Sequence, residues 1–296
     1  MALDILVPFW GDPALLRTTV ESVLAQDNSD WRLTVVDDAY PDPCVQAWFS
    51  TIDDARIRYV RHPTNQGIVA TFRDCVALAT QEIMVTVGCD DVLLPSYVDV
   101  VLEAHRRFPG AAMIQPGVRV IDGEGHVVRT LVDGVKQRLL RPHVSEATLL
   151  SGEPLATSLL HGDWLYWPSM AFRVDRIRTV GFRDDLPIIL DLALILDLVY
   201  RGESLLLEPT VCFHYRRHAA SASSTRLVDG SRFADERTYF AIAARLAHGL
   251  GWRTAERAAR ARLTSRAHAV TLLPGAVRGG RWTTTRALVR HAVGGA

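Results

Sequence analysis

The sequence predicts an α/β protein with a single, mostly parallel sheet that is flanked by helices. Short apolar runs, typical of buried strands, alternate with segments that have the period of a helix. This alternation is the pattern of a parallel sheet covered on both faces. Two apolar runs are followed by paired aspartates, Asp37–Asp38 and Asp90–Asp91, at the position where open α/β sheets bind ligands. At 296 residues, the chain can bury a large core.

The first hundred residues are expected to hold four strands separated by helices. Apolar runs predict the strands at residues 5–9, 33–36, 57–60 and 83–87. The first helix is expected over 14–26, because Asp12 is a suitable N-cap and Pro13 suits the first helical position. Another is expected from Gly67 to Ala79, and Pro95 can open the next. Parallel strands would place both aspartate pairs at one edge of the sheet.

The remaining chain is predicted to alternate less regularly. A strand and a hairpin are expected within 111–128, since residues 122–125 form a good turn sequence, followed by a loop with a short helix over 133–154. The run that starts at Asp191 is apolar nearly all round, which predicts a buried helix. The last strand is expected at 204–207, and further helices at 233–248, 252–273 and 282–293.

Charges balance over the whole chain, at 33 basic and 33 acidic residues, but not along it. From Arg226 onward there are thirteen arginines and four acidic residues. No nucleic-acid partner is expected, because no aromatic and basic interleaving accompanies these arginines. A basic amphipathic segment can lie on anionic lipid, or it can be a packing or dimer element with a solvated face. Residues 225–296 are therefore predicted to be an arginine-rich helical extension, for membrane contact, for dimerisation or for packing on the rest of the chain.

Cysteine spacing and hydropathy predict a cytoplasmic protein, peripheral at the inner face of the membrane if the extension binds lipid. The four cysteines form no C-x-x-C pair and have no metal-ligand spacing, so reduced thiols are expected. No basic segment precedes the first apolar run, so no signal peptide is expected. The longest apolar stretch, Leu186–Tyr200, contains Asp191 and Asp197 and is too short and too charged to span a bilayer.

Asp90 and Asp91 are the centre of the functional prediction. Adjacent carboxylates repel one another, so a divalent cation or a hydrogen-bonded sugar is their natural partner. The alternative is an N-cap beside a solvated aspartate. No G-x-G-x-x-G follows the first strand and no G-x-x-x-x-G-K-[ST] is present, which disfavours dinucleotide oxidoreductases and P-loop enzymes.

Several short blocks, taken in order and spacing, resemble family 2 glycosyltransferases of the GT-A fold. The early blocks are Leu6–Trp10, Ser22–Gln26, Val35–Asp38, Asn65–Gly67, and Asp90–Asp91 with Leu94–Pro95. Later blocks, at 180–185 and 214–223, extend the resemblance to about Ser223. The resemblance implies a GT-A domain over 1–224, with a nucleotide-sugar half (1–110) and an acceptor half (111–224). It also implies an inverting enzyme of bacterial polysaccharide or glycoconjugate biosynthesis.

The resemblance places a nucleotide-diphosphate sugar, with a UDP-sugar favoured, at the strand ends. Asp38 would accept the imide hydrogen of a uracil-like base. Asp90 would hold the ribose, and Asp91 would hold Mg²⁺ or Mn²⁺ on the diphosphate, whose developing charge a hard cation neutralises. The other implied donor-site residues are Pro8, Phe9, Trp10, Asn65, Gly67, Arg73 and Arg217. His218 is the preferred second metal ligand and His214 the weaker one, although a solvated loop histidine is an equal alternative.

Two positions depart from the family pattern. Gly88 stands where the family often has an acid, so one ribose or metal contact is missing or supplied differently. Arg73 is one residue out of register with the family's Ala-Arg-Asn and could be a solvated helix cation. A non-catalytic nucleotide-sugar-binding or scaffold protein is therefore the alternative. A sugar-1-phosphate nucleotidyltransferase is disfavoured, because no glycine-rich basic loop follows the first strand.

On the acceptor side, Asp191 resembles the acid that opens a family helix and acts as the catalytic base. Desolvation by apolar neighbours would raise the pKa of Asp191, whereas the helix N-terminus would oppose that rise. The alternative is that Asp191 is a simple N-cap. Asp197 is expected to pair with Arg201. Trp167 and Ser169 are expected to contact a hydroxyl-bearing acceptor, which could be a glycan, a lipid-linked molecule or a small molecule.

Overall fold

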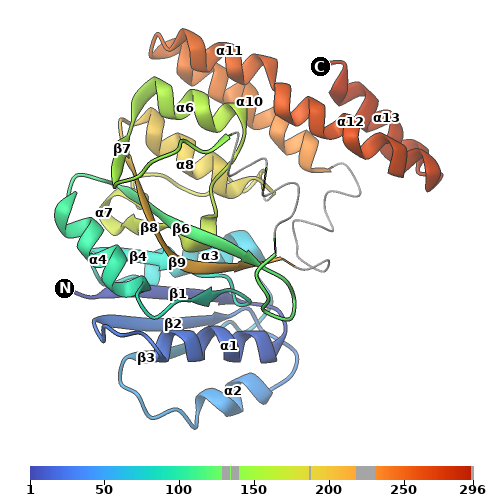
Figure 1. Ribbon diagram of the computed structural model, residues 1–296. Helices are drawn as coiled ribbons and strands as arrows, with labels where there is room; N and C mark the ends of the chain where they lie inside the picture. Colours follow the sequence, from blue (N-terminus) through green and yellow to red (C-terminus); the bar gives the residue numbers. More distant parts are fainter. Residues whose placement is uncertain (129–133, 135–139, 187, 218–230, 295–296) are drawn as a thin grey trace.

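The computed structural model describes residues 1–128, 134, 140–186, 188–217 and 231–294, and its core is one nine-stranded sheet (Figure 1). The strands follow the order β3-β2-β1-β4-β8-β6-β9-β5, with β7 paired to β9. Their bounds are β1 Leu3–Phe9, β2 Trp31–Asp37, β3 Ile57–Arg61, β4 Ile83–Thr86, β5 Val92–Leu93, β6 Met113–Ile121, β7 Thr148–Leu150, β8 Ala171–Arg173 and β9 Leu205–Arg216.

The sheet is parallel in its first half and mixed in its second. β3, β2, β1 and β4 are parallel neighbours, as predicted. β8 then runs antiparallel to both β4 and β6, and β9 is parallel to β6 but antiparallel to β5 and β7. The expected single, mostly parallel sheet is therefore confirmed, although the short strands β5, β7 and β8 run antiparallel to their neighbours. The strands that reverse direction, β5, β7 and β8, are too short to show a period in the sequence.

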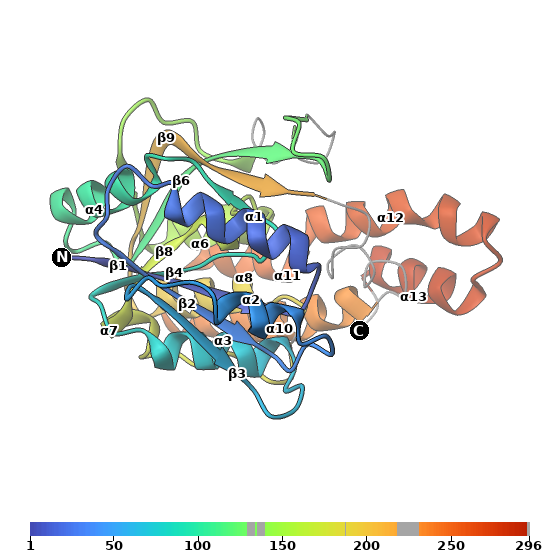
Figure 2. The same cartoon turned by 90° about the horizontal axis from the view of Figure 1, so that it is seen from below.

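Helices cover both faces of the sheet (Figures 1 and 2). Their bounds are α1 Pro13–Leu24, α2 Cys44–Phe49, α3 Ile68–Leu78, α4 Tyr97–Arg107, α6 Gly152–His161, the 3₁₀ helix η2 Trp167–Ser169, α7 Val174–Ile177, α8 Leu190–Tyr200, α10 Ser231–Gly249, α11 Arg253–Ala261, α12 Leu263–Arg278 and α13 Trp282–Ala292. Side chains that alternate along β1 and β4 supply one core to each face. One core packs against α1, α2 and α4, and the other against α3, α6, α8, α10 and α11.

The local signals at the start of α1 and at the hairpin act as expected. The Asp12 carboxylate accepts the Ala14 amide at 2.8 Å, and Pro13 occupies the first helical position. After β6, the Asp122 amide donates to the His126 carbonyl at 3.0 Å, and Ile121 bridges Val127. The turn reverses the chain, and up to residue 128, where the described segment ends, the returning part forms one bridge.

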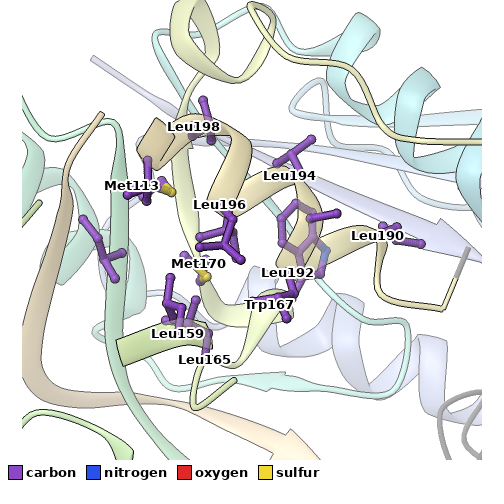
Figure 3. Packing of buried hydrophobic residues seen from close by; sticks show 14 of the residues in the cluster. Met113, Leu159, Leu165, Trp167, Met170, Leu190, Leu192, Leu194, Leu196 and Leu198 are labelled. Atoms are coloured by element: carbon purple, nitrogen blue, oxygen red, sulfur yellow. The ribbon is translucent and has the colours of Figure 1, made fainter. Parts of the chain in front are cut away.

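α8 is the buried helix that the sequence predicts. Eight of its residues are buried, and its leucines point into a cluster that also contains Met113, Met170 and Trp167 (Figure 3). Asp197 forms an ion pair with Arg183 at 2.9 Å and accepts a hydrogen bond from the Tyr239 hydroxyl at 3.1 Å. The expected pair with Arg201 is therefore wrong, because a tertiary partner occupies the carboxylate.

The C-terminal helices belong to two packing environments. α10 and α11 contribute Tyr239, Phe240 and several alanines to the same core as α8. α12 and α13 form a hairpin with its own small cluster, built on Ala269, Ala276 and Leu288. The single helix expected over 252–273 is interrupted, because Arg262 adopts the left-handed conformation with φ 49°. Among the described residues, no helix has both the length and the apolar character needed to cross a bilayer.

Candidate active site

Three parallel strands bring their carboxyl ends to one edge of the sheet. The β1–β2 register pairs Phe9 with Asp37, and the Asp38 amide donates to the Phe9 carbonyl at 3.0 Å. The loop after β4 reaches the loop after β1, where a side chain at Gly11 would lie 3.2 Å from Cys89 Sγ. The two aspartate pairs therefore open on the same edge, as the sequence predicts.

Asp37 is a structural carboxylate at this edge. It is fully buried, and it accepts hydrogen bonds from the Tyr40 amide at 2.6 Å, from Arg61 Nη1 at 2.6 Å and from the Tyr59 hydroxyl. Burial, together with the hydrogen bond to Asp37, raises the pKa of Tyr59 to about 12. Asp37 thus ties the end of β2 to the end of β3.

Asp38 organises the loop that leads into α3. Its carboxylate accepts the Gln66 amide at 2.7 Å and the Gly67 amide at 2.8 Å, and His62 Nδ1 lies 2.8 Å away. Burial opposes its charge, but the hydrogen bonds from His62, Gln66 and Gly67 lower the pKa of Asp38 below its ordinary value. Gly67 can present its amide to the carboxylate because its φ is 84°, a conformation that suits glycine.

The other residues expected on the base side differ in their exposure. Pro8 and Phe9 are buried, and the Phe9 ring lies 5.1 Å from that of Tyr40. Trp10 is 51% exposed and meets Tyr40 edge to face, so its ring is available at the strand ends. Asn65 is exposed and donates through Nδ2 to the Asp38 carbonyl at 3.2 Å.

Asp90 and Asp91 form a tight turn after β4. The Asp91 amide donates to the Gly88 carbonyl at 3.2 Å, and Asp91 Oδ1 accepts the Arg216 amide at 2.8 Å. Asp91 Oδ2 is buried and has no hydrogen-bond partner within the described part of the chain. Burial and the neighbouring charge of Asp90 raise the pKa of Asp91 well above its ordinary value. This oxygen is therefore an acceptor that the protein itself leaves unsatisfied.

Gly88 is part of the same geometry. A Cβ at this position would lie 2.5 Å from Asp91 Oδ2 and 3.0 Å from Asp90 Oδ1. Two carboxylate oxygens, one from each aspartate, thus converge on the space that a side chain at residue 88 would fill. A pair of convergent carboxylate oxygens with an unsatisfied acceptor suits a hard divalent cation.

β9 supplies two residues that the sequence reasoning missed. Arg216 is 5% exposed, and its Nε donates to the Asp90 carbonyl at 2.7 Å while its Nη1 donates to the Asp122 and Gly123 carbonyls. Arg216 thus fixes the aspartate turn against the hairpin turn. The arginine expected from the sequence is the neighbouring Arg217. Its amide donates to the Ile121 carbonyl at 2.8 Å, and its guanidinium lies 5.7 Å from the centre of the Tyr215 ring.

Tyr215, the second missed residue, relates the aspartate turn to α8. Burial raises the pKa of its phenol, and the negative charges of Asp91, Asp90 and Asp191 raise the pKa further. The phenol therefore lies within electrostatic range of all three carboxylates. The sequence signal for Tyr215 is its position, next to Arg216, inside the block at 214–223 that resembles the family.

Asp191 lies in the first turn of α8, as predicted. Its Oδ1 accepts the Leu192 amide at 2.8 Å. The Asp191 residue is partly exposed at the N-terminus of the helix. Arg232 at the start of α10 is close to it. Burial opposes the charge of Arg232, but Glu236, Asp163 and Asp191 raise its pKa. The C-terminal extension therefore contributes a cation to the surroundings of Asp191.

Two residues expected to contact the acceptor lie in the interior instead. Trp167 is 6% exposed and packs against Phe72, Phe172 and Phe182. Ser169 is fully buried, where its hydroxyl donates to the Tyr166 carbonyl and accepts from Gln115 Nε2, each at 2.8 Å. Pro168 does mark a turn, but this 3₁₀ turn directs both side chains inward.

Of the other expected ligands, Arg73 is engaged elsewhere, and His214 lies on β9 opposite Val92, the residue after Asp91. Arg73 pairs with Asp184 at 2.6 Å and is 48% exposed, so it is directed toward the loop before α8. His218 lies outside the described residues. His214 is partly buried, and burial together with Arg119 and Arg216 lowers its pKa. In the described chain, the three residues whose ligand atoms cluster are Asp122, Glu124 and His126, in the exposed turn after β6.

Known proteins share this architecture. The chain superposes on residues 1–349 of TarS from S. aureus with a TM-score of 0.68 at 12% identity, covering 99% of this chain and 81% of that fragment. A structure of the same TarS fragment with UDP-GlcNAc gives a TM-score of 0.64. The mannosyltransferase PcManGT from Pyrobaculum calidifontis, solved with GDP-Man and Mn²⁺, gives 0.60 at 18% identity, covering 99% of this chain and 86% of PcManGT. The expected GT-A fold is confirmed.

Sequence comparison identifies the family. WcaA of Escherichia coli (strain K12), named as a candidate colanic acid biosynthesis glycosyl transferase, is 28% identical over 123 residues. The match covers 41% of this chain and 44% of WcaA, so the chain spans less than half of the length of that relative. Residues 4–149 match the family model described as glycosyl transferase family 2. Residues 4–149 of the chain therefore belong to glycosyl transferase family 2.

Proposed function

We propose that the chain is an inverting glycosyltransferase that moves a sugar from a nucleotide-diphosphate sugar to an acceptor hydroxyl. The observation that carries the proposal is the Asp90–Asp91 turn, where a buried carboxylate oxygen, Asp91 Oδ2, has no hydrogen-bond partner among the described residues. This turn lies at the carboxyl edge of parallel strands, and the charges of both the turn and Asp191 act on the Tyr215 phenol. TarS bound to UDP-GlcNAc and PcManGT bound to GDP-Man have the same fold, which supports a nucleotide-sugar donor.

Donor binding would use the edge formed by β1, β2 and β4. Trp10 would stack on the base, and Asp38 would accept its imide hydrogen, which favours a uracil nucleotide. Asn65 and Gly67 hold the Asp38 loop in place, and Asp90 would bind the ribose. Arg217 would approach the diphosphate from the end of β9, whereas Arg73 would first have to leave Asp184.

Asp90 and Asp91 would hold Mg²⁺ or Mn²⁺, because two of their oxygens converge over Gly88. The cation, when bound, neutralises charge on the departing diphosphate. His218 remains the proposed further ligand. Arg216 has a positioning role, because it holds the Asp90 carbonyl and the Asp91 carboxylate in one arrangement.

Asp191 would act as the general base. Its carboxylate would accept the proton of the acceptor hydroxyl while that oxygen attacks the anomeric carbon from the face opposite the diphosphate. The bond to the acceptor oxygen forms as the bond to the diphosphate breaks, so the anomeric configuration inverts. The buried leucines of α8 fix the helix that carries Asp191.

A donor-binding protein without transfer activity is the second candidate. The pairing of Arg73 with Asp184 and the glycine at position 88 both favour it, because each removes a donor contact that the family often has. The cytoplasm is the proposed location, since the four cysteines are free thiols, as a reducing compartment requires.

Isothermal titration with UDP, with and without Mn²⁺, followed by hydrolysis assays across UDP-, dTDP- and GDP-sugars, separates these candidates. An enzyme would bind UDP more tightly with Mn²⁺ and would hydrolyse a donor. Asp191→Asn should retain UDP affinity and lower turnover about 1000-fold. Asp185→Asn, the same change at an exposed aspartate before α8, is the control and should retain turnover. UDP binding without hydrolysis or transfer would favour the second candidate.

A further inference from the structure

The hairpin of α12 and α13 exposes apolar side chains in two regular stripes. On α12 the exposed residues Leu263, Ala267, Val270, Pro274 and Val277 recur at alternating steps of four and three. This spacing places them along one face of the helix. On α13, Trp282 and Val289 are seven residues apart and share a face with Val293 at the C-cap, and Trp282 is 65% exposed. We name these residues the α12 stripe and the α13 stripe.

The stripes do not belong to the core of the hairpin. The inward faces of the two helices are filled by Ala269, Ala276 and Leu288, which pack with Phe233 of α10. Arg266 Nε donates to the Ala292 carbonyl at 2.8 Å, which ties the end of α13 to the start of α12. The hairpin is therefore held together from within, and both stripes remain on its outside. Clusters of exposed apolar residues of this kind mark interaction surfaces.

The charge around the stripes identifies the partner. No acidic residue occurs after Glu256, whereas the same stretch contains eight arginines. Arg278, Arg281 and Arg286 are exposed beside the stripes. A second copy of the same face would bring arginines together without one carboxylate to pair them. The surface is instead complementary to an anionic partner that also accepts apolar side chains, and an anionic lipid bilayer has both properties.

We propose that the α12–α13 hairpin lies in the plane of an anionic membrane surface, with both stripes inserted at the level of the headgroups. Trp282 follows the turn between the helices, and tryptophan is enriched at this depth of a bilayer. No described helix can span the bilayer, so the contact is peripheral. The hairpin projects beyond the body in both views, toward the side to which β6 and β9 point (Figures 1 and 2).

This direction suggests the class of acceptor, and this part of the inference rests on the proposed function. β9 ends at Arg216, which holds the Asp90–Asp91 turn, so the candidate active site and the hairpin lie toward the same side of the molecule. A docked hairpin would bring the active site to the membrane. The acceptor would then be a hydroxyl carried at the bilayer surface rather than a freely diffusing sugar.

Sedimentation of the full chain with lipid vesicles tests the docking. Vesicles of phosphatidylcholine with about one third phosphatidylglycerol should bind the protein, and binding should weaken as salt is added. Pure phosphatidylcholine vesicles should bind it at least about tenfold more weakly. Equal binding to both vesicles, or no binding to either, would overturn the proposal.

Charge reversal locates the surface. Arg278→Glu with Arg286→Glu should weaken binding to the anionic vesicles at least about 100-fold. Arg32→Glu with Arg58→Glu makes the same charge change at exposed arginines of the sheet and should leave binding within about twofold. Similar losses in both double variants would mean that general charge, not the hairpin, binds lipid, and would overturn the proposal.

Apolar truncation separates insertion from simple charge attraction. Trp282→Ala should weaken vesicle binding about tenfold, whereas Leu149→Ala, at an exposed leucine of β7, should leave it unchanged. All altered residues are exposed, and circular dichroism should give unchanged melting curves. A dimer in light scattering that the Trp282 variant dissociates would show that a second copy covers the hairpin. UDP titration of the same variants, which should be unchanged, distinguishes failed docking from failure of the proposed function.

Discussion

The loop around Asp38 and the turn at Asp90–Asp91 lie at the same sheet edge, yet the hydrogen bonding and the pKa shifts of Asp38 and Asp91 are opposite. Asp38 receives two backbone amides and His62, and its pKa is lowered. Asp91 receives one amide on Oδ1, its Oδ2 has no described partner, and its pKa is raised. The first carboxylate maintains the local fold, whereas the second keeps one oxygen that no described residue satisfies. Ligand binding is therefore expected to change the turn more than the loop.

Asp91→Asn is the substitution that should separate the two sites most. Removing one ligand charge is expected to lower transfer about 1000-fold, equivalent to about 4 kcal/mol of barrier. The free energy of unfolding should not fall, because Asp91 Oδ2 has no hydrogen-bond partner among the described residues and the buried carboxylate is repelled by Asp90. Steady-state kinetics and urea unfolding measure the two effects. Asp37→Asn, the same change at a fully bonded buried aspartate, should instead reduce stability. A loss of stability without a loss of turnover in Asp91→Asn would reverse the comparison.

Asp38→Ala should show the structural side of the comparison. It removes the acceptor of the Gln66 and Gly67 amides, and hydrogen bonds to a charged acceptor contribute about 1.5–3 kcal/mol each. Because water can replace part of this loss, we expect the free energy of unfolding to fall by about 3 kcal/mol. Urea unfolding at neutral pH checks the value. A fully stable variant that lost only UDP affinity would mean that Asp38 serves the ligand alone.

Gly88→Ala tests the space that the turn keeps open. The new Cβ would lie 2.5 Å from Asp91 Oδ2, which is the end of a short, buried side chain with little room to move. We expect Mn²⁺-dependent turnover to fall about tenfold, equivalent to about 1.4 kcal/mol. Gly123→Ala, in the nearby turn where a Cβ would contact nothing, is the matched control. Equal turnover in wild type and Gly88→Ala would show that the convergent oxygens are not used.

The smallest expected effect is the pH-dependent contribution of Asp38 to stability, which acid unfolding should reveal. The pKa of Asp38 is lower in the folded chain than in the unfolded one, so this group contributes stability above its unfolded value of 3.8 and loses it as pH falls through the lower folded pKa. Asp38→Asn should therefore flatten the stability profile in that acidic range. Melting temperatures from pH 5 downward measure it, and parallel profiles for wild type and variant would contradict the assignment.

The fold of the first hundred residues could be predicted because its signals are local. Long apolar runs define β1 to β4, and Asp12 with Pro13 defines the start of α1. Beyond β4, strands of two or three residues carry no period, and Arg262 breaks a helix without a glycine or proline. The roles of Tyr215 and Arg216 depend on β9 meeting the aspartate turn from more than a hundred residues away. Trp167 was misplaced because a proline marks a turn without saying on which side its neighbour packs.

The shared core of α8 and α10 limits how the protein can be divided. Tyr239 and Phe240 are nearly inaccessible to solvent, and each contributes about 2 kcal/mol by burial, against a typical total stability of about 5–15 kcal/mol. A fragment that stopped at residue 224 would uncover the helix that carries Asp191 and would not keep its shape. Chimeras that exchange C-terminal regions between relatives must therefore exchange the facing side chains of α8 as well. The helix that carries Asp191 and the helices that pack against it would then change as one unit.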